Sequence, residues 1–161
     1  MTTIPCAIKL FIKERTTFDL ISLDGKAKRY DILSLSDKFP QLLALKDRKL
    51  FKKGKLMGFG GVVWNDELDI GTETVYEEGV DVTSEYPDIP FYQIGYRIKQ
   101  ARLEKEMLQE DLSKATGIQQ ADISRIEKGV ANPSVKTLKR IADALGVKLS
   151  ITFENPSKTG L

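Results

Sequence analysis

The sequence predicts an α+β protein in which a small β-rich domain comes first and an all-helical domain ending in a strand follows. Residues up to about 82 show mostly the short apolar runs and turn signals of β-strands. A polar stretch with two prolines then interrupts this pattern, and apolar residues recur at helical spacing after it. We therefore expect a domain at 1–83, a linker at 84–90, a second domain at 91–155 and a tail at 156–161.

A β-hairpin is the first feature predicted in the N-terminal half. Residues 7–12 are apolar and β-rich, and residues 18–21 form a second such run. The Asp24-Gly25 pair that follows is a strong hairpin-turn signal. We expect the return strand to include residues 30–33.

The rest of this half predicts one helix and a second strand pair. Residues 39–50 carry apolar side chains at the spacing of a short amphipathic helix. Residues 60–64 form another strand-like run, closed by Asn65-Asp66, and Leu68 and Ile70 are placed to pair back across that turn.

Composition removes most kinds of catalytic chemistry. The 161 residues include no histidine, which excludes imidazole metal sites and histidine-based triads. The single cysteine, Cys6, excludes an intrachain disulfide and a cysteine-based zinc cluster. Neither a phosphate-binding loop nor a dinucleotide motif is present. We expect no catalytic residues, no metal and no cofactor, and therefore no enzyme.

The overall character is that of a globular cytoplasmic protein. No apolar run approaches the ~18 residues that span a bilayer, and the first residues lack the pattern of a signal peptide. We expect no membrane partner. Residues 91–161 contain 12 Lys or Arg and 8 Asp or Glu, so this half is positive. A modest positive charge suits a polyanion but does not by itself identify one.

Four helices are expected in the C-terminal half. Apolar spacing predicts them at residues 94–105, 109–116 and 119–127 and from Ser134 to Leu145. Gly117, Gly129 and Gly146 supply the permissive backbone for a sharp turn and for two helix ends. Ser134 is a suitable N-cap for the last helix.

Residues 109–129 resemble the helix-turn-helix of the phage repressor and Cro family, also called the Xre type. The similarity extends over about residues 94–145 and includes the segment ANPSVKTLKRIADALGV. Four residues fall on the family's structural positions: Leu112, Gly117, Ile123 and Ile126. Two residues depart from its pattern. Glu106 stands where glycine is frequent, and Leu108 stands where a Ser or Thr commonly caps the second helix.

The resemblance implies a role for each polar residue of this segment. The third helix of the family enters the DNA major groove, so the implied base-reading residues are Gln119, Gln120, Ala121, Ser124 and Arg125. The implied phosphate contacts are Gln109, Lys128, Asn132, Ser134 and Lys136. Gln109 would also brace Gln120, and Arg102 and Glu127 match a structural salt bridge of the family.

Simpler interpretations stand beside these roles. The polar face of the third helix is equally what a solvated face would look like, and only its place in the motif favours DNA. Asp66, Glu67 and Asp69 could hold a hard cation, but a solvated turn explains them as well. A helix-turn-helix retained only for protein contacts is the main alternative function.

Residues 147–153 predict a strand that needs a partner, because an isolated strand is not stable. The helix and tail TLKRIADALGVKLSITF are similar to those of HigA-type antitoxins, which implies pairing across a two-fold axis in a homodimer.

Residues 10–78 resemble a small bacterial domain family of unknown function, on the Asp-Gly hairpin, the run YDILSLSDKFPQLLALKDRKLF and the closing VVWNDELDI. This resemblance implies a domain that binds a protein partner or a ligand. Together, the two halves predict a regulator that binds double-stranded DNA and represses transcription, including that of its own operon. An antitoxin-like role is the sharper version, and a protein-interaction adaptor is the alternative.

Overall fold

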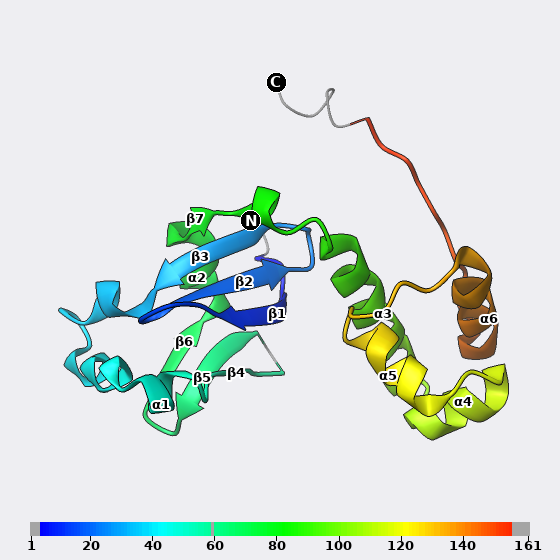
Figure 1. Ribbon diagram of the computed structural model, residues 1–161, viewed down its shortest axis with the longest axis horizontal. Helices are drawn as coiled ribbons and strands as arrows, with labels where there is room; N and C mark the ends of the chain where they lie inside the picture. The colour runs from blue at the N-terminus through cyan, green and yellow to red at the C-terminus, as the bar shows by residue number, and fades with distance from the viewer. Residues whose placement is uncertain (1–3, 59, 156–161) are drawn as a thin grey trace. The chain divides into compact units, whose positions relative to one another are not determined.

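The computed structural model describes residues 4–58 and 60–155, so the expected tail at 156–161 lies outside the described residues. The chain divides into two compact units, Met1–Gln93 and Ile94–Leu161. The first contains all the strands of the described chain, and the second consists of helices and a C-terminal extended segment (Figure 1). The α+β class predicted from the sequence is confirmed.

The N-terminal unit is built on a four-stranded antiparallel sheet. Its strands, in the order β1-β2-β3-β7, are β1 (Ala7–Ile12), β2 (Thr17–Ser22), β3 (Ala27–Asp31) and β7 (Val80–Asp81). The predicted hairpin joins β2 to β3 through Asp24-Gly25, where Gly25 has a φ of 91°. Asp24 stabilises this turn because its carboxylate accepts a hydrogen bond from the Lys26 N–H at 3.1 Å.

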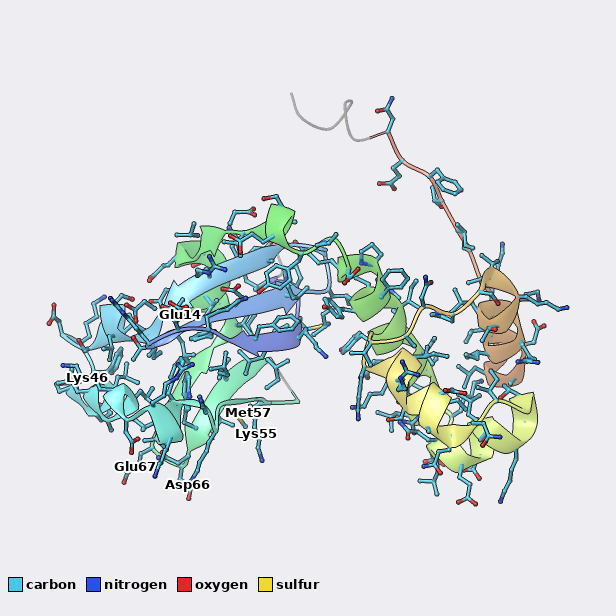
Figure 2. The ribbon with its side chains drawn as sticks, in the orientation of Figure 1. Glu14, Lys46, Lys55, Met57, Asp66 and Glu67 are labelled. Carbon is cyan, nitrogen blue, oxygen red and sulfur yellow. The ribbon has the colours of Figure 1, made fainter. Side chains whose placement is uncertain are left out.

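A second antiparallel sheet contains the other predicted strand pair. Its order is β4-β5-β6, with bounds β4 (Lys55–Leu56), β5 (Gly61–Asn65) and β6 (Leu68–Gly71). Asn65 closes the β5–β6 turn because its side-chain oxygen accepts hydrogen bonds from the N–H groups of Glu67 and Leu68, at 2.9 and 3.0 Å. Asp66 and Glu67 lie exposed at this turn (Figure 2). No cluster of three potential metal ligands occurs in residues 4–58 and 60–155.

The helical segments of this unit are shorter than the sequence predicts. They are η1 (Ile32–Leu35), η2 (Pro40–Lys46), α1 (Arg48–Phe51), α2 (Thr72–Glu78) and η3 (Thr83–Glu85). The return strand was predicted to include residues 30–33, but it ends at Asp31, whose carboxylate accepts from the Leu33 N–H and starts η1. The helix expected at 39–50 is a 3₁₀ segment followed by one turn of α-helix.

Trp64 lies in the main core of the N-terminal unit. It packs against Phe18 and Phe51, with ring centroids 6.0 and 5.8 Å away, and its indole N–H donates to the Phe51 carbonyl at 2.9 Å. Trp64 is the only tryptophan of the chain. Its fluorescence therefore reports on the N-terminal unit alone.

A buried aspartate ties residues 84–90 to the sheet. Asp19 of β2 is fully buried, and its carboxylate accepts two hydrogen bonds from Arg29, both at 2.8 Å, and one from the Tyr86 hydroxyl at 2.5 Å. Burial and the bond to Asp19 raise the pKa of Tyr86 above its ordinary value. Ile89 is also buried, against Ile21 and Ala27. The segment expected as a linker is therefore ordered, since it contains an anchored tyrosine and the first turn of a helix.

The C-terminal unit contains four helices around a separate core. They are α3 (Ile89–Glu104), whose residues from Ile94 belong to this unit, α4 (Gln109–Thr116), α5 (Gln120–Glu127) and α6 (Val135–Leu145). The core residues are Leu112, Ile118, Ile123, Ile126, Ile141 and Leu145. The sequence correctly predicts where α4, α5 and α6 lie, whereas α3 begins five residues earlier than expected.

The predicted C-terminal strand is wrong for the single chain. Residues 147–155 form neither helix nor strand, and Ile151 and Phe153 are exposed. A strand exists only where a neighbour supplies hydrogen bonds, and neither sheet of the described residues includes this segment.

Candidate nucleic-acid interface

Three side-chain hydrogen bonds hold the turn between α4 and α5. Gly117 adopts a left-handed φ of 76°, and the buried Ile118 follows it. The Ser113 hydroxyl donates to the Ile118 carbonyl at 2.6 Å. The Thr116 hydroxyl accepts from the Ile118 N–H at 3.2 Å and donates to the Leu112 carbonyl at 2.7 Å. These bonds fix the direction in which α5 leaves the turn.

The start of α4 explains both departures from the family pattern. Glu106 has a φ of 55°, a left-handed conformation that glycine adopts without the penalty other residues incur. Leu108 cannot cap the helix with its side chain. Instead, the Asp111 carboxylate reaches back and accepts a hydrogen bond from the Leu108 N–H at 2.8 Å. Asp111 thus forms the reciprocal half of a capping box from within the first turn of α4, whereas Leu108 makes no side-chain capping bond.

Arg102 of α3 and Glu127 of α5 form a buried ion pair. Arg102 Nε lies 2.6 Å from Glu127 Oε1, Arg102 Nη2 lies 3.0 Å from Oε2, and the two side chains are only 8% and 3% exposed. Arg102 also donates to the Met107 carbonyl at 2.7 Å. The hydrogen bond with Glu127 raises the pKa of Arg102 above its ordinary value.

Gln109 joins this ion pair. Its side-chain amide donates to Glu127 Oε2 at 3.0 Å, so Glu127, at the end of α5, accepts from Arg102 of α3 and from Gln109 at the start of α4. The family resemblance implies that Gln109 contacts a phosphate and braces Gln120. The structure places its amide on Glu127, and the half-buried outer surface of the side chain remains for a phosphate contact.

α3 and the end of α5 approach each other closely at Gly95. A Cβ atom at this position would lie 2.5 Å from the carbonyl oxygens of both Ile126 and Glu127. That separation is well inside van der Waals contact, so only glycine fits without moving one of the helices. Together with the Arg102–Glu127 pair, this contact sets the position of α5 on α3.

One face of α5 is polar and free. Ile123 and Ile126 are buried on the opposite face, while Gln120, Ala121 and Arg125 are exposed and Ser124 is half-buried. Gln119 is the exposed N-cap residue, and its side chain makes no capping hydrogen bond. Arg125 approaches Asp122 at 4.0 Å, and both groups are more than half exposed, so this pair holds the arginine weakly. Four of the five residues expected to read bases therefore lie on the accessible side of α5, and the fifth, Gln119, lies at the start of this helix.

The segment after α5 carries the other expected contact residues. Lys128, Asn132 and Lys136 are exposed, and Gly129 turns the chain with a φ of 76°. Ser134 caps α6, since its hydroxyl accepts from the Thr137 N–H at 3.1 Å and lies 3.0 Å from the Thr137 hydroxyl. The hydroxyl of Ser134 is thus already used in the protein.

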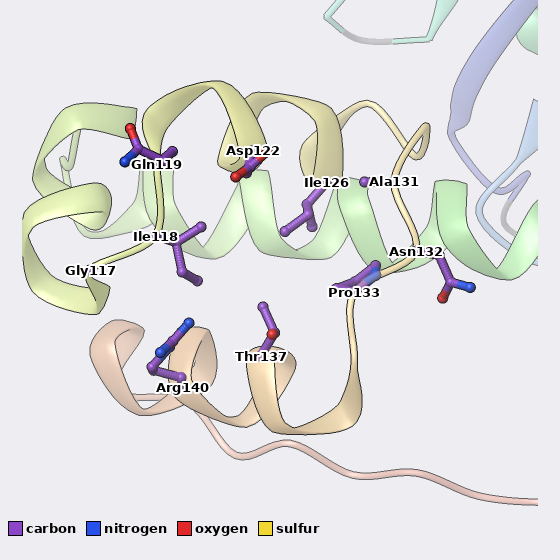
Figure 3. A pocket seen from close by; sticks show the side chains of 10 residues that line it. All are labelled: Gly117, Ile118, Gln119, Asp122, Ile126, Ala131, Asn132, Pro133, Thr137 and Arg140. Carbon is purple, nitrogen blue, oxygen red and sulfur yellow. The ribbon is translucent and has the colours of Figure 1, made fainter.

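A hollow of about 390 Å³ separates the start of α5 from α6. Ile118, Gln119 and Asp122 line one side, and Thr137 and Arg140 face them from α6 (Figure 3). The sequence identified neither Thr137 nor Arg140. The available signal was the spacing of Lys136 and Arg140, four residues apart on a helix whose opposite side is apolar.

The chain is similar to known proteins over this unit. Residues 98–151 match the family described as "Helix-turn-helix". An uncharacterized HTH-type transcriptional regulator of Bacillus subtilis, YqaF, is 41% identical over 58 residues, which cover 36% of this chain and 76% of the relative. The immunity repressor protein of Bacillus phage phi105 is 35% identical over 57 residues, which cover 35% of this chain and 40% of that repressor.

A solved structure also matches part of the chain. It is a restriction-modification controller protein, determined as a tetramer with its natural 35 base-pair operator. It is 38% identical, with a TM-score of 0.33, and the match covers 34% of this chain and 72% of the controller.

In residues 4–58 and 60–155, no helix is long and apolar enough to cross a membrane.

Proposed function

The chain belongs to the helix-turn-helix family of transcriptional regulators, and we propose that it represses transcription by reading an operator with α5. It is a DNA-binding regulator. The finer proposal concerns which residues make the contacts and which gene is controlled. One observation carries it: the polar face of α5 is free of strong protein contacts, while every group that positions α5 is buried or hydrogen-bonded.

Each proposed base contact follows from side-chain chemistry. Glutamine can form two hydrogen bonds with adenine, and arginine can form two with guanine, which suits Gln120 and Arg125. Gln119 and Ser124 extend the same polar surface, and the small Ala121 leaves room for a thymine methyl group. These residues would read the major groove.

The proposed phosphate contacts surround this surface. Lys128, Asn132 and Lys136 follow α5, and Gln109 lies at the start of α4. Backbone contacts of this kind set the register of a protein on DNA without carrying sequence information. Because Ser134 uses its hydroxyl as the cap of α6, we assign its contact to the N-terminus of that helix, where the dipole attracts phosphate.

We propose that the regulated gene is its own. Purified protein should shift a duplex from upstream of its gene in a gel, with a Kd on the order of 10⁻⁸ M at physiological salt. An excess of the same unlabelled duplex should compete, and a scrambled duplex should not. Equal competition by both duplexes would refute operator recognition there. It would favour the alternative, a helix-turn-helix kept for protein contacts.

We also propose that the N-terminal unit binds a protein partner, as in an antitoxin-like regulator. A groove of about 290 Å³ supports this proposal, because Phe39 lines it and remains 48% exposed beside the open edge of β6. Leu43 is exposed nearby on η2. An apolar surface next to an unpaired strand edge is suited to another chain.

The homodimer is proposed from the C-terminal segment. Residues 147–153 alternate apolar and polar, and Ile151 and Phe153 are 53% and 96% exposed. A second copy would supply the strand partner that this segment lacks, and two copies would read two half-sites of an operator.

The Ile151→Asp/Phe153→Asp double variant tests this dimer. We expect light scattering at tens of micromolar to give a dimer for the native protein and a monomer for the variant, because the charges remove the apolar face of the strand. The matched control is Ser150→Asp/Thr152→Asp, which places the same charges on the other face. A native protein that is already monomeric would refute the proposal.

A further inference from the structure

Two cations lie one helical turn apart on the outer surface of α6. Lys136 and Arg140 are both exposed, and neither makes a salt bridge with the described residues. Lys139, on the same helix, differs because its ammonium group pairs with Asp143. Among the three cations of α6, two therefore have no carboxylate partner among the described residues, and one is paired with a carboxylate of its own helix.

Arg140 stands at the mouth of two adjoining hollows. It lines the one beside α5 together with Gln119, and the one along α6 together with Lys136 and the ion-paired Lys139 and Asp143. Figure 3 shows its side chain, with that of Thr137, turned from α6 toward the start of α5. The Gln119 amide and the Thr137 hydroxyl, which line the same hollow, can both donate hydrogen bonds to an oxyanion.

Asp122 is the acidic group that lines the same hollow. Its carboxylate belongs to α5 and is drawn toward Arg125, 4.0 Å away, so negative charge lies on the α5 side. Positive charge from Arg140 lies on the α6 side, and the N-terminal dipole of α6 adds to it near Lys136. An anion would therefore occupy the α6 side of the hollow.

We propose that Lys136 and Arg140 form a two-phosphate track for the DNA backbone, with Arg140 binding a phosphate that no sequence motif assigned. This inference rests on the proposed DNA contact of α5 and extends that contact along α6. Four residues advance a helix by about 6 Å. Phosphates of one strand follow at about 3.4 Å along the duplex axis, so two long side chains can reach separate phosphates.

The experiment measures how binding depends on salt. Arg140→Gln and Lys139→Gln remove the same charge from the same helix, so they form a matched pair. Each phosphate contact contributes about −0.9 to the slope of log affinity against log salt. We expect Arg140→Gln to weaken that slope by about 0.9 for each bound protomer. The same loss lowers the affinity roughly tenfold per protomer at 0.1 M salt. Lys139→Gln should leave the slope unchanged.

Two duplexes separate this inference from the proposed function. A backbone contact should weaken binding equally to the upstream duplex and to its scrambled form. If Arg140→Gln weakens the salt dependence of binding to both duplexes, and the native protein does not prefer the upstream duplex, the track is supported and operator recognition at that site is refuted. Specific binding with equal slopes for Arg140→Gln and Lys139→Gln would refute the track alone. Absence of binding to either duplex would refute both.

A folding control and a conservative variant complete the test. Arg140→Lys keeps the charge and should retain most of the slope, whereas a structural role of the guanidinium would not be rescued in this way. The thermal transition measured by circular dichroism should be the same for all variants, because Arg140 is exposed.

Discussion

Replacing Arg125 with alanine is expected to abolish specific binding to the operator while leaving the fold intact. The guanidinium lies on the free face of α5, where a paired contact with guanine contributes ~1–3 kcal/mol for each protomer. A two-fold complex would lose twice that amount. Gln120→Ala should act in the same way at a different base pair. Fluorescence anisotropy with the upstream duplex and with single-base variants of it measures both effects.

The informative control is Lys114→Ala. Lys114 is an exposed cation on the neighbouring helix, paired with Glu110 at 3.4 Å, and it lies outside the proposed surface. Its removal should change affinity little. If Arg125→Ala and Lys114→Ala weaken binding equally, then α5 does not read bases. A reading role also predicts that Arg125→Ala relaxes discrimination at one base pair, which a general loss of charge would not do.

The largest effect on stability is expected for Glu127→Ala. The substitution leaves Arg102 buried without its carboxylate and removes the acceptor of Gln109. Breaking a buried pair in this way costs about 3–5 kcal/mol. Urea unfolding followed by far-ultraviolet circular dichroism measures the loss. The fluorescence of Trp64 should show a much smaller shift, because that side chain lies in the other unit.

A double variant separates two contributions to the free energy of unfolding: the penalty for leaving a buried charge unpaired, and the net stabilisation by the ion pair itself. Arg102→Met/Glu127→Leu removes both charges and keeps most of the volume. It should recover much of the stability lost in Glu127→Ala, since apolar replacements of buried pairs are often neutral. Equal stability of Glu127→Ala and the native protein would mean that Arg102 is not buried in solution.

The C-terminal unit was predictable because its signals are local. α4, α5 and α6 each combine an apolar stripe with a residue that starts or stops the helix, such as Gly117 or Ser134. The first helix was placed too late because its opening turn is held in the N-terminal unit, through Ile89. That contact joins residues far apart in sequence, and periodicity does not detect it.

The N-terminal unit was less predictable for the same reason. β4 and β7 are two residues long and depend entirely on their neighbours β5 and β3. α2 has seven residues, too few for a clear period. The exposure of Leu43 could not be foreseen either, since the 3₁₀ geometry of η2 rotates its side chains away from the α-helical pattern used to predict it.

Within the proposed interface, the residue types and the exposed positions can be predicted from sequence, but the hydrogen bonds that these side chains make within the protein cannot. The exposed positions of α5 follow from the buried Ile123 and Ile126. That Gln109 bonds to Glu127, and that Ser134 is occupied by Thr137, depends on side-chain geometry that spacing does not contain. Arg140 was overlooked because its meaning depends on the hollow beside α5.

Because Gly95 lies at a close contact between α3 and α5, mutations there should be inherited differently from mutations on the exposed face of α5. Any larger side chain there would push against the carbonyl oxygens of Ile126 and Glu127 and destabilise the fold, so the change would behave as a recessive, heat-sensitive allele. In the proposed homodimer, by contrast, an Arg125 allele would make folded subunits that pair with normal ones and inactivate them, so it would be dominant. Inheritance pattern alone would then separate residues that position α5 from residues that work on its surface.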